Sequence, residues 1–246
     1  MNPVNHVRNL YWVNYMSRVW QVKMNIKFAK SVKILILLVV AAVVSGALIF
    51  SGTLSKSTAA VAYAEVNDIS VNGEVITKDN IEKNYANLPE ETRSEITKKE
   101  LADNLVGNKL LVQEANKRGV TVTDEEVGNY IEQAMTLNNI DRTEIERQLS
   151  ELGYTFDEYK ASLKESMSIS KLLDQEIDLK NIRVSDSDVD NFIQKNQAEF
   201  QDIFNEGDPE LEQAFRVKVK QKLTQDKQQE LVNSYVRSLR SNAEIV

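Results

Sequence analysis

The feature that most restricts the fold is a series of helix starts between residues 123 and 188. Each pairs a Ser, Thr or Asp with a carboxylate residue three positions later, the pattern of an N-terminal capping box: Thr123/Glu126, Asp141/Glu144, Thr155/Glu158 and Ser185/Asp188. Gly119 and Gly153 come shortly before two of these starts, and glycine readily takes the left-handed conformation in which helices end. The series predicts a domain built mainly from short helices.

The residues before this series predict a hairpin followed by two helices. Asn72-Gly73 favours a type I′ turn between the apolar pieces Ile69–Val71 and Val75–Ile76. Thr77 can cap a short helix that ends near Pro89. We expect a longer helix from about Glu90 to Arg118, because apolar residues recur there at helical spacing.

The end of the chain predicts one long helix that returns to the domain. Asp208 is suited to cap it and Pro209 to occupy its first position, and the pattern continues to about Ser241. Its apolar stripe shifts around the axis halfway along, so its two ends are expected to pack on different partners. The last four residues, 243–246, are short and partly β-branched.

Composition excludes several kinds of chemistry. The 246 residues allow one or two domains. There is no cysteine, and the single histidine, His6, lies in the N-terminal tail, which excludes Ser-His-Asp catalysis in the main domain and disfavours a zinc site. Seven of the 30 Lys and Arg residues lie within residues 1–64, which hold no Asp or Glu. The remainder therefore has 23 basic and 37 acidic residues, a balance that repels nucleic acid.

One apolar segment predicts a membrane helix. Residues 34–50 are 17 consecutive uncharged residues, and the uncharged stretch continues to Leu54. A helix over residues 34–54 would span roughly 30 Å, the thickness of the hydrocarbon core. Basic residues precede it, so the positive-inside rule makes residues 1–33 a cytoplasmic tail and places the C-terminal part outside the cytoplasm, beyond a linker of residues 55–68.

Two features of this N-terminal region allow alternatives. The Ala62-Tyr63-Ala64 pattern would suit a signal peptidase, so the domain could be secreted after cleavage following Ala64 instead of remaining anchored. Translation could also begin at Met24, which would leave Lys27, Lys30 and Lys33 as an ordinary basic region before the apolar run.

The order of these elements resembles the N-terminal module of SurA/PrsA-type extracytoplasmic chaperones. The resemblance covers roughly residues 69–200 and the last forty or so. It implies an all-α, SurA N-terminal-like or trigger-factor C-like fold over residues 69–246, with a small β element in which Ile245 meets the Ile69–Val71 strand. It also implies a role in holding unfolded secreted polypeptides.

One part of the family pattern is missing. Relatives usually carry parvulin-type prolyl isomerase domains after the helix equivalent to Ser185–Phe200. Here the segment Gln201–Gly207 is far too short for such a domain, and parvulin sites use histidines. We therefore expect no isomerase activity, no catalytic residue, no cofactor and no metal.

Peptide holding needs exposed apolar and adaptable side chains rather than reacting groups. Three candidates lie on the third predicted helix: Tyr130, Met135 and Leu137. Four lie around the turn at Gly153: Tyr154, Phe156, Tyr159 and Met167. The alternative interpretation is that these residues form an ordinary core. Acidic pairs such as Glu125-Glu126 are expected only to interact with helix N-termini.

The sequence therefore predicts a membrane-anchored holdase for unfolded or newly exported polypeptides. Two alternatives stay open at this point: an anchored module that recruits one dedicated partner, and a peptidyl-prolyl isomerase-related protein.

Overall fold

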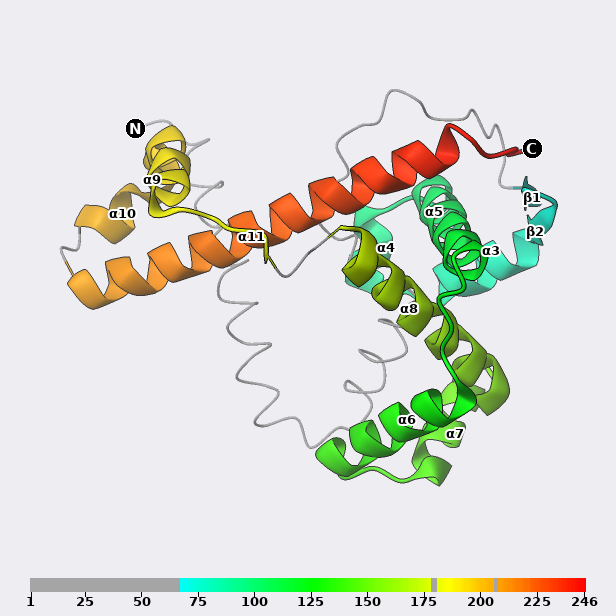
Figure 1. The fold of residues 1–246 in the computed structure, drawn as a ribbon. Helices are drawn as coiled ribbons and strands as arrows, with labels where there is room; N and C mark the ends of the chain where they lie inside the picture. The colour runs from blue at the N-terminus through cyan, green and yellow to red at the C-terminus, as the bar shows by residue number, and fades with distance from the viewer. Residues whose placement is uncertain (1–66, 178–180, 206–207) are drawn as a thin grey trace. The chain divides into compact units, whose positions relative to one another are not determined.

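The computed structural model describes residues 67–177, 181–205 and 208–246 (Figure 1). These residues form two compact units: residues 184–223 make one, and residues 67–183 together with 224–246 make the other. The larger unit begins with the strands β1 (Ile69–Val71) and β2 (Glu74–Ile76). The helices follow in the order α3 (Lys78–Ala86), α4 (Glu90–Glu95), α5 (Lys98–Lys117), α6 (Asp124–Asn138), α7 (Arg142–Glu151), α8 (Phe156–Glu176), α9 (Asp186–Lys195), α10 (Gln197–Asn205) and α11 (Pro209–Arg240).

The predicted hairpin and the returning chain end are both confirmed. Asn72 and Gly73 have φ values of 51° and 85°, as a type I′ turn requires, and they connect the antiparallel strands β1 and β2. On the other side of β1, Ile245 forms a bridge with Val71. The amide of Ser70 donates to the carbonyl of Val246 at 2.8 Å, so the end of the chain completes the sheet.

The prediction of one helix over residues 90–118 is wrong, because this segment forms two helices, α4 and α5. The backbone is extended at Ile96, with φ −125° and ψ 147°, and α5 begins after Thr97. Thr97 and Glu100 form a full capping box that replaces the lost helical hydrogen bonds. The Tyr85 hydroxyl lies 3.2 Å from the carbonyl oxygen of Ile96 and helps to satisfy the end of α4. The apolar stripe continues across the break and conceals it in the sequence.

The predicted starts of α6, α7, α8 and α9 are confirmed. Thr123, Thr155 and Ser185 each form a capping box with the acidic residue three positions later. Asp141 caps α7 by accepting from the amide of Glu144 at 2.8 Å. Gly119 and Gly153 have φ values of 71° and 74°, which other residues adopt only at a cost.

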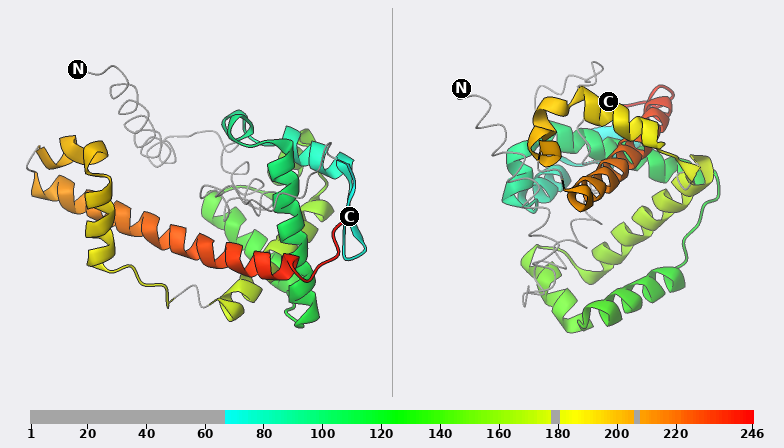
Figure 2. Two further views of the ribbon diagram at one scale, coloured as in Figure 1. Left: turned by 90° about the horizontal axis from the view of Figure 1, so that it is seen from above. Right: turned by 90° about the vertical axis from the view of Figure 1, so that its left-hand side faces the viewer.

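Helix α8 joins two hydrophobic cores of the larger unit. Its first half packs with α6 and α7 around Val127, Ile145 and Leu163. Its second half packs with α5 and the end of α11 around Leu111, Leu172 and Val232. The right-hand view of Figure 2 shows α6 running alongside α8. The position of one helix in two cores explains why its buried face shifts along its length.

The smaller unit has an aromatic core. The predicted helix over residues 185–200 ends at Lys195, and α10 begins at Gln197, so the prediction of one continuous helix is wrong. Asn196 donates its side-chain amide to the carbonyl of Phe192 at 2.7 Å, which competes with continued helical bonding. Phe200 and Phe215 lie at the centre of this unit, with ring centroids 4.8 Å apart.

The predicted start of the last helix is confirmed. The Asp208 carboxylate accepts from the amide of Glu210 at 2.9 Å, and α11 begins at Pro209. Because α10 ends at Asn205, no isomerase domain is inserted between α10 and α11. The two halves of α11 do bury different faces: Phe215 and Val219 in the smaller unit, Val232 and Val236 in the larger one.

The predicted membrane helix over residues 34–54 lies outside the described residues, as do the tail of residues 1–33 and most of the linker. Within the described part of the chain, no helix has both the length and the apolar character needed to cross a membrane.

Candidate peptide-binding surface

Most of the candidate residues lie in an acidic lobe of the larger unit, residues 121–165. This lobe contains eleven Asp and Glu residues and four Lys and Arg residues. It consists of α6, α7 and the first half of α8, joined by their own hydrophobic core. Two lysines connect the helices of the lobe: Lys164 contacts Asp124 at 2.7 Å, and Lys171, which follows the lobe on α8, contacts Glu126 at 2.6 Å.

Two of the seven candidates are exposed apolar side chains on one side of α6. Tyr130 is 48% exposed and Leu137 is 85% exposed. They are seven residues apart, which is about two helical turns, so they lie on the same face. Both side chains are accessible from solution.

The other five candidates contribute to the core of the lobe. Tyr159 is only 6% exposed, and burial raises the pKa of its hydroxyl to about 12, so the ring is neutral and enclosed. The remaining four are partly buried against the same core: Met135, Tyr154, Phe156 and Met167. The structure thus brings five of the candidates around one core and leaves Tyr130 and Leu137 exposed beside it.

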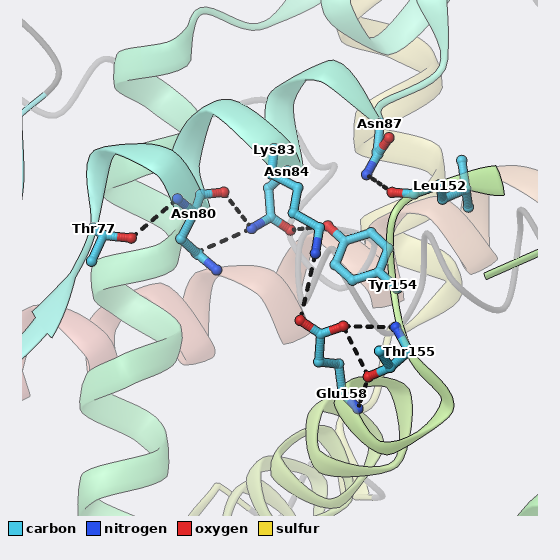
Figure 3. Close-up of polar contacts among 9 residues, drawn as sticks. All are labelled: Thr77, Asn80, Lys83, Asn84, Asn87, Leu152, Tyr154, Thr155 and Glu158. Carbon is cyan, nitrogen blue, oxygen red and sulfur yellow. Dashed lines mark hydrogen bonds and ion pairs between the residues drawn. The ribbon is translucent and has the colours of Figure 1, made fainter. Parts of the chain in front are cut away.

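A set of polar contacts holds the turn between α7 and α8 against α3 (Figure 3). Asn87 donates its side-chain amide to the carbonyl of Leu152 at 2.9 Å, across 65 residues of sequence. The Tyr154 hydroxyl donates to the Oδ1 of Asn84 at 3.3 Å, and Asn84 itself is buried. Burial raises the pKa of the Tyr154 hydroxyl, which therefore remains protonated and able to donate.

Sequence reasoning missed the contribution of α3 to this site. Asn84 and Asn87 carry no pattern that points to a partner so distant in the chain. The only contact of these two side chains that local spacing suggests is within α3, where the side-chain amide of Asn84 donates to the carbonyl of Asn80 at 2.8 Å.

Lys83 lies between an aromatic ring and a carboxylate in the same place. Its Nζ is 3.9 Å from the centroid of the Tyr154 ring and 3.5 Å from the carboxylate of Glu158. Hydrogen bonds from Thr155, its backbone amide first, lower the pKa of Glu158, and Lys83 adds to this effect. Glu158 is therefore ionised at neutral pH.

A second cation lies over the neighbouring ring. The Arg142 guanidinium carbon is 4.3 Å from the Phe156 ring centroid, and its Nε donates to Glu146 at 2.7 Å. Both contacts combine an aromatic face with a carboxylate, the two groups that attract cations most strongly in proteins.

These groups are suited to binding rather than to covalent chemistry. Among the described residues, no group of three or more acidic or histidine side chains is placed to hold a metal ion. The acidic start of α9 interacts with basic residues of α11, where Asp186 lies 2.9 Å from Lys220 and Asp190 pairs with Arg216.

The fold is shared with solved chaperone structures. A chain from the structural work on PEB4 and Cj1289, two SurA-like chaperones of Campylobacter jejuni, matches with a TM-score of 0.51 and 14% sequence identity. The match covers 74% of this chain and 98% of that chain.

Sequence comparison with curated proteins agrees. The chain is 30% identical over 132 residues to chaperone SurA of Cupriavidus pinatubonensis, covering 50% of this chain and 26% of the relative. It is 28% identical over 94 residues to chaperone SurA of Ralstonia nicotianae, covering 38% of this chain and 19% of the relative. The chain thus spans about a quarter or less of the length of these relatives.

The family can be assigned from a third comparison. The family model of the SurA-like N-terminal domain matches residues 24–173, which is more than half of the chain. With the helical fold and the completed sheet described above, this match shows that the chain belongs to the SurA-like N-terminal domain family.

Proposed function

We propose that this protein is a membrane-tethered extracytoplasmic chaperone that holds unfolded or newly exported polypeptides. The observation that carries the proposal is the family match over residues 24–173, whose relatives in the curated set are named chaperones. The exposed apolar face of α6 supports it, because a holdase needs apolar surface that remains accessible in water.

The proposed tether is the apolar segment of residues 34–54. The family match begins at residue 24, so it includes this segment. Cleavage after Ala64 is the alternative, and it would release the same domain outside the cytoplasm.

Holding requires no isomerase activity. A client segment would bury apolar side chains against Tyr130 and Leu137, while the surrounding carboxylates keep the complex soluble. We propose that Met135, Tyr154, Phe156 and Met167 extend this surface, and that Tyr159 supports it from within the core. Prolyl isomerisation of a test peptide is expected to proceed at its uncatalysed rate.

Aggregation of an unfolded client tests the proposal. The 246-residue chain, purified in a mild detergent, is mixed with several unrelated denatured proteins, and light scattering is recorded after dilution of the denaturant. We expect near-stoichiometric amounts to suppress scattering for most clients. An absence of suppression for all clients would contradict the holdase proposal.

A pair of variants connects this activity to α6. Leu137→Ser removes the most exposed large apolar side chain that lies on the proposed surface, and it is expected to weaken suppression without lowering the melting temperature. Leu231→Ser is the matched control, because Leu231 is 42% exposed but lies on α11. Equal effects of the two substitutions would show that suppression does not depend on the α6 surface.

A further inference from the structure

The acidic lobe contains the same arrangement twice: an aromatic ring, a cation over its face and a carboxylate that pairs with the cation. The first set is Tyr154, Lys83 and Glu158, and the second is Phe156, Arg142 and Glu146. The two rings are two residues apart in the sequence. In each set the cation comes from outside the segment that carries the ring.

These sets are accessible from solvent. The side chain of Lys83 is 34% exposed and that of Glu158 is 52% exposed, so the ammonium group is not enclosed. Arg142 and Glu146 are more exposed, at 65% and 46%. A contact of this kind is weak, about 0.5–1 kcal/mol at an exposed site, so a competing cation can displace it.

The charge of the lobe favours such a competitor. Eleven acidic and four basic residues give it a strongly negative field, which attracts cationic segments and repels anionic ones. The internal cations show which chemical group the ring and carboxylate accept.

We infer that the two ring and carboxylate pairs, Tyr154/Glu158 and Phe156/Glu146, are subsites for Lys or Arg side chains of an unfolded client, and that Lys83 and Arg142 occupy them in the free protein. This inference rests on the proposed peptide-holding function and adds a client class to it, namely segments in which basic residues alternate with apolar ones. The apolar residues would contact α6, and each basic residue would replace an internal cation over its ring.

The test measures the binding of two peptides by fluorescence anisotropy. One labelled peptide alternates Arg with Leu, and the other has citrulline, which is neutral and of nearly the same shape, in place of Arg. Both are titrated with the 246-residue chain in a mild detergent. The inference predicts tighter binding of the Arg peptide.

Removal of an internal cation is the decisive variant. Lys83→Met uncovers the Tyr154 ring, and it should tighten binding of the Arg peptide by about 2- to 5-fold, the factor that corresponds to one exposed cation–π contact. Lys164→Met is the matched control, because Lys164 also pairs with a carboxylate of the lobe but lies over no aromatic ring of the described residues. Both substitutions change the net charge by the same amount. The subsite is therefore measured by how much more Lys83→Met than Lys164→Met tightens binding of the Arg peptide.

Variants of Tyr154 and Glu158 test the two groups that are proposed to bind the client's cation. Tyr154→Leu should weaken binding of the Arg peptide, whereas Tyr154→Phe should retain it, because phenylalanine keeps the aromatic face and loses only the bond to Asn84. Glu158→Gln should also weaken it while preserving the capping box, which accepts glutamine. Its control is Glu126→Gln, the same change in the equivalent capping box at the start of α6.

The outcomes distinguish the inference from the function on which it rests. The subsites would be overturned if Lys83→Met tightened binding of the Arg peptide no more than Lys164→Met does. They would also be overturned if Lys83→Met tightened binding of the citrulline peptide by the same factor. Equal binding of both peptides by the wild type would also overturn them and leave peptide holding intact. Binding of neither peptide would contradict the holding function and the subsites together.

Discussion

Two capping-box glutamates, Glu126 and Glu158, each also contact a lysine. Glu126 accepts from the amide of Thr123 at 2.8 Å and also contacts Lys171 of α8 at 2.6 Å. Lys171 in turn donates to the carbonyl of Thr121 at 3.1 Å. One carboxylate therefore begins α6 and connects it to α8.

This double role predicts how the stability of the lobe depends on pH. The hydrogen bond from Lys171, followed by that from the Thr123 amide, lowers the pKa of Glu126. The pKa of a glutamate in the unfolded chain is about 4.3, and the pKa of Glu126 in the folded protein is lower. The ionised carboxylate therefore stabilises the folded state at pH values above about 4.3, and this contribution is lost as the pH falls through the pKa of the folded protein. Glu126→Gln should therefore be less stable than the wild type at neutral pH and equal to it near about pH 2, as measured by urea unfolding.

Glu132→Gln is the control for this prediction. Glu132 is an exposed residue of the same helix and lies outside the capping box, so its replacement should leave the free energy of unfolding at neutral pH close to that of the wild type. A constant difference between Glu126→Gln and the wild type at all pH values would contradict the prediction.

At the scale of elements, the returning helix packs closely on α5. A Cβ atom built on Gly107 would lie 3.4 Å from the Cγ1 of Val236 in α11. The absence of a side chain at Gly107 therefore allows the two helices to approach. Arg240, at the end of α11, donates a hydrogen bond to the carboxylate of Asp103 in α5 at 2.7 Å and so stabilises the packing of the two helices.

A large side chain at Gly107 should displace the end of α11. Gly107→Leu is expected to lower the free energy of unfolding by about 1–3 kcal/mol through overpacking. Because Ile245 follows α11 into the sheet, amide exchange at Ser70, which bonds to Val246, should also accelerate. Exchange measured by mass spectrometry or NMR would show both effects.

Gly107→Ala is the informative comparison. Its methyl group would make a contact at the short end of the ordinary range, while alanine favours the helix by about 1 kcal/mol over glycine. We expect a neutral or slightly stabilising effect. A destabilisation as large as that of the leucine variant would show that the helices approach more closely than the structure indicates.

At the scale of the whole molecule, two units with separate cores share α11. The smaller unit depends on Phe215, which is 3% exposed and contacts the rings of Phe200 and Phe204. The larger unit depends on other residues of the same helix, among them Val232. The cores can therefore respond separately to substitution.

Phe215→Ala should unfold the smaller unit alone. A buried phenylalanine truncated to alanine costs about 3–5 kcal/mol, which is large for a core of this size. We expect amide protection to disappear in α9 and α10 and to remain in α5 and α8, as measured by hydrogen exchange. Val217→Ala, at an exposed position on the same helix, should change neither unit. Loss of protection in both units together would show that they unfold as one.

The sequence by itself determined where most helices begin and end. Thr123, Thr155 and Asp208 act on backbone groups within three residues, so their effect is local and can be read from spacing. The break at Ile96 was missed although Thr97 and Glu100 carry the same signal, because the apolar stripe across it predicts a continuous helix.

The tertiary structure decided which candidate side chains are accessible. Tyr130 and Tyr159 are both aromatic residues at helical spacing, yet one is exposed and the other is enclosed by the core of the lobe. Lys83 meets Tyr154 across 71 residues of sequence, a pairing that no local pattern encodes. Local hydrogen bonds fix the helices, whereas burial and long-range contacts depend on how those helices pack.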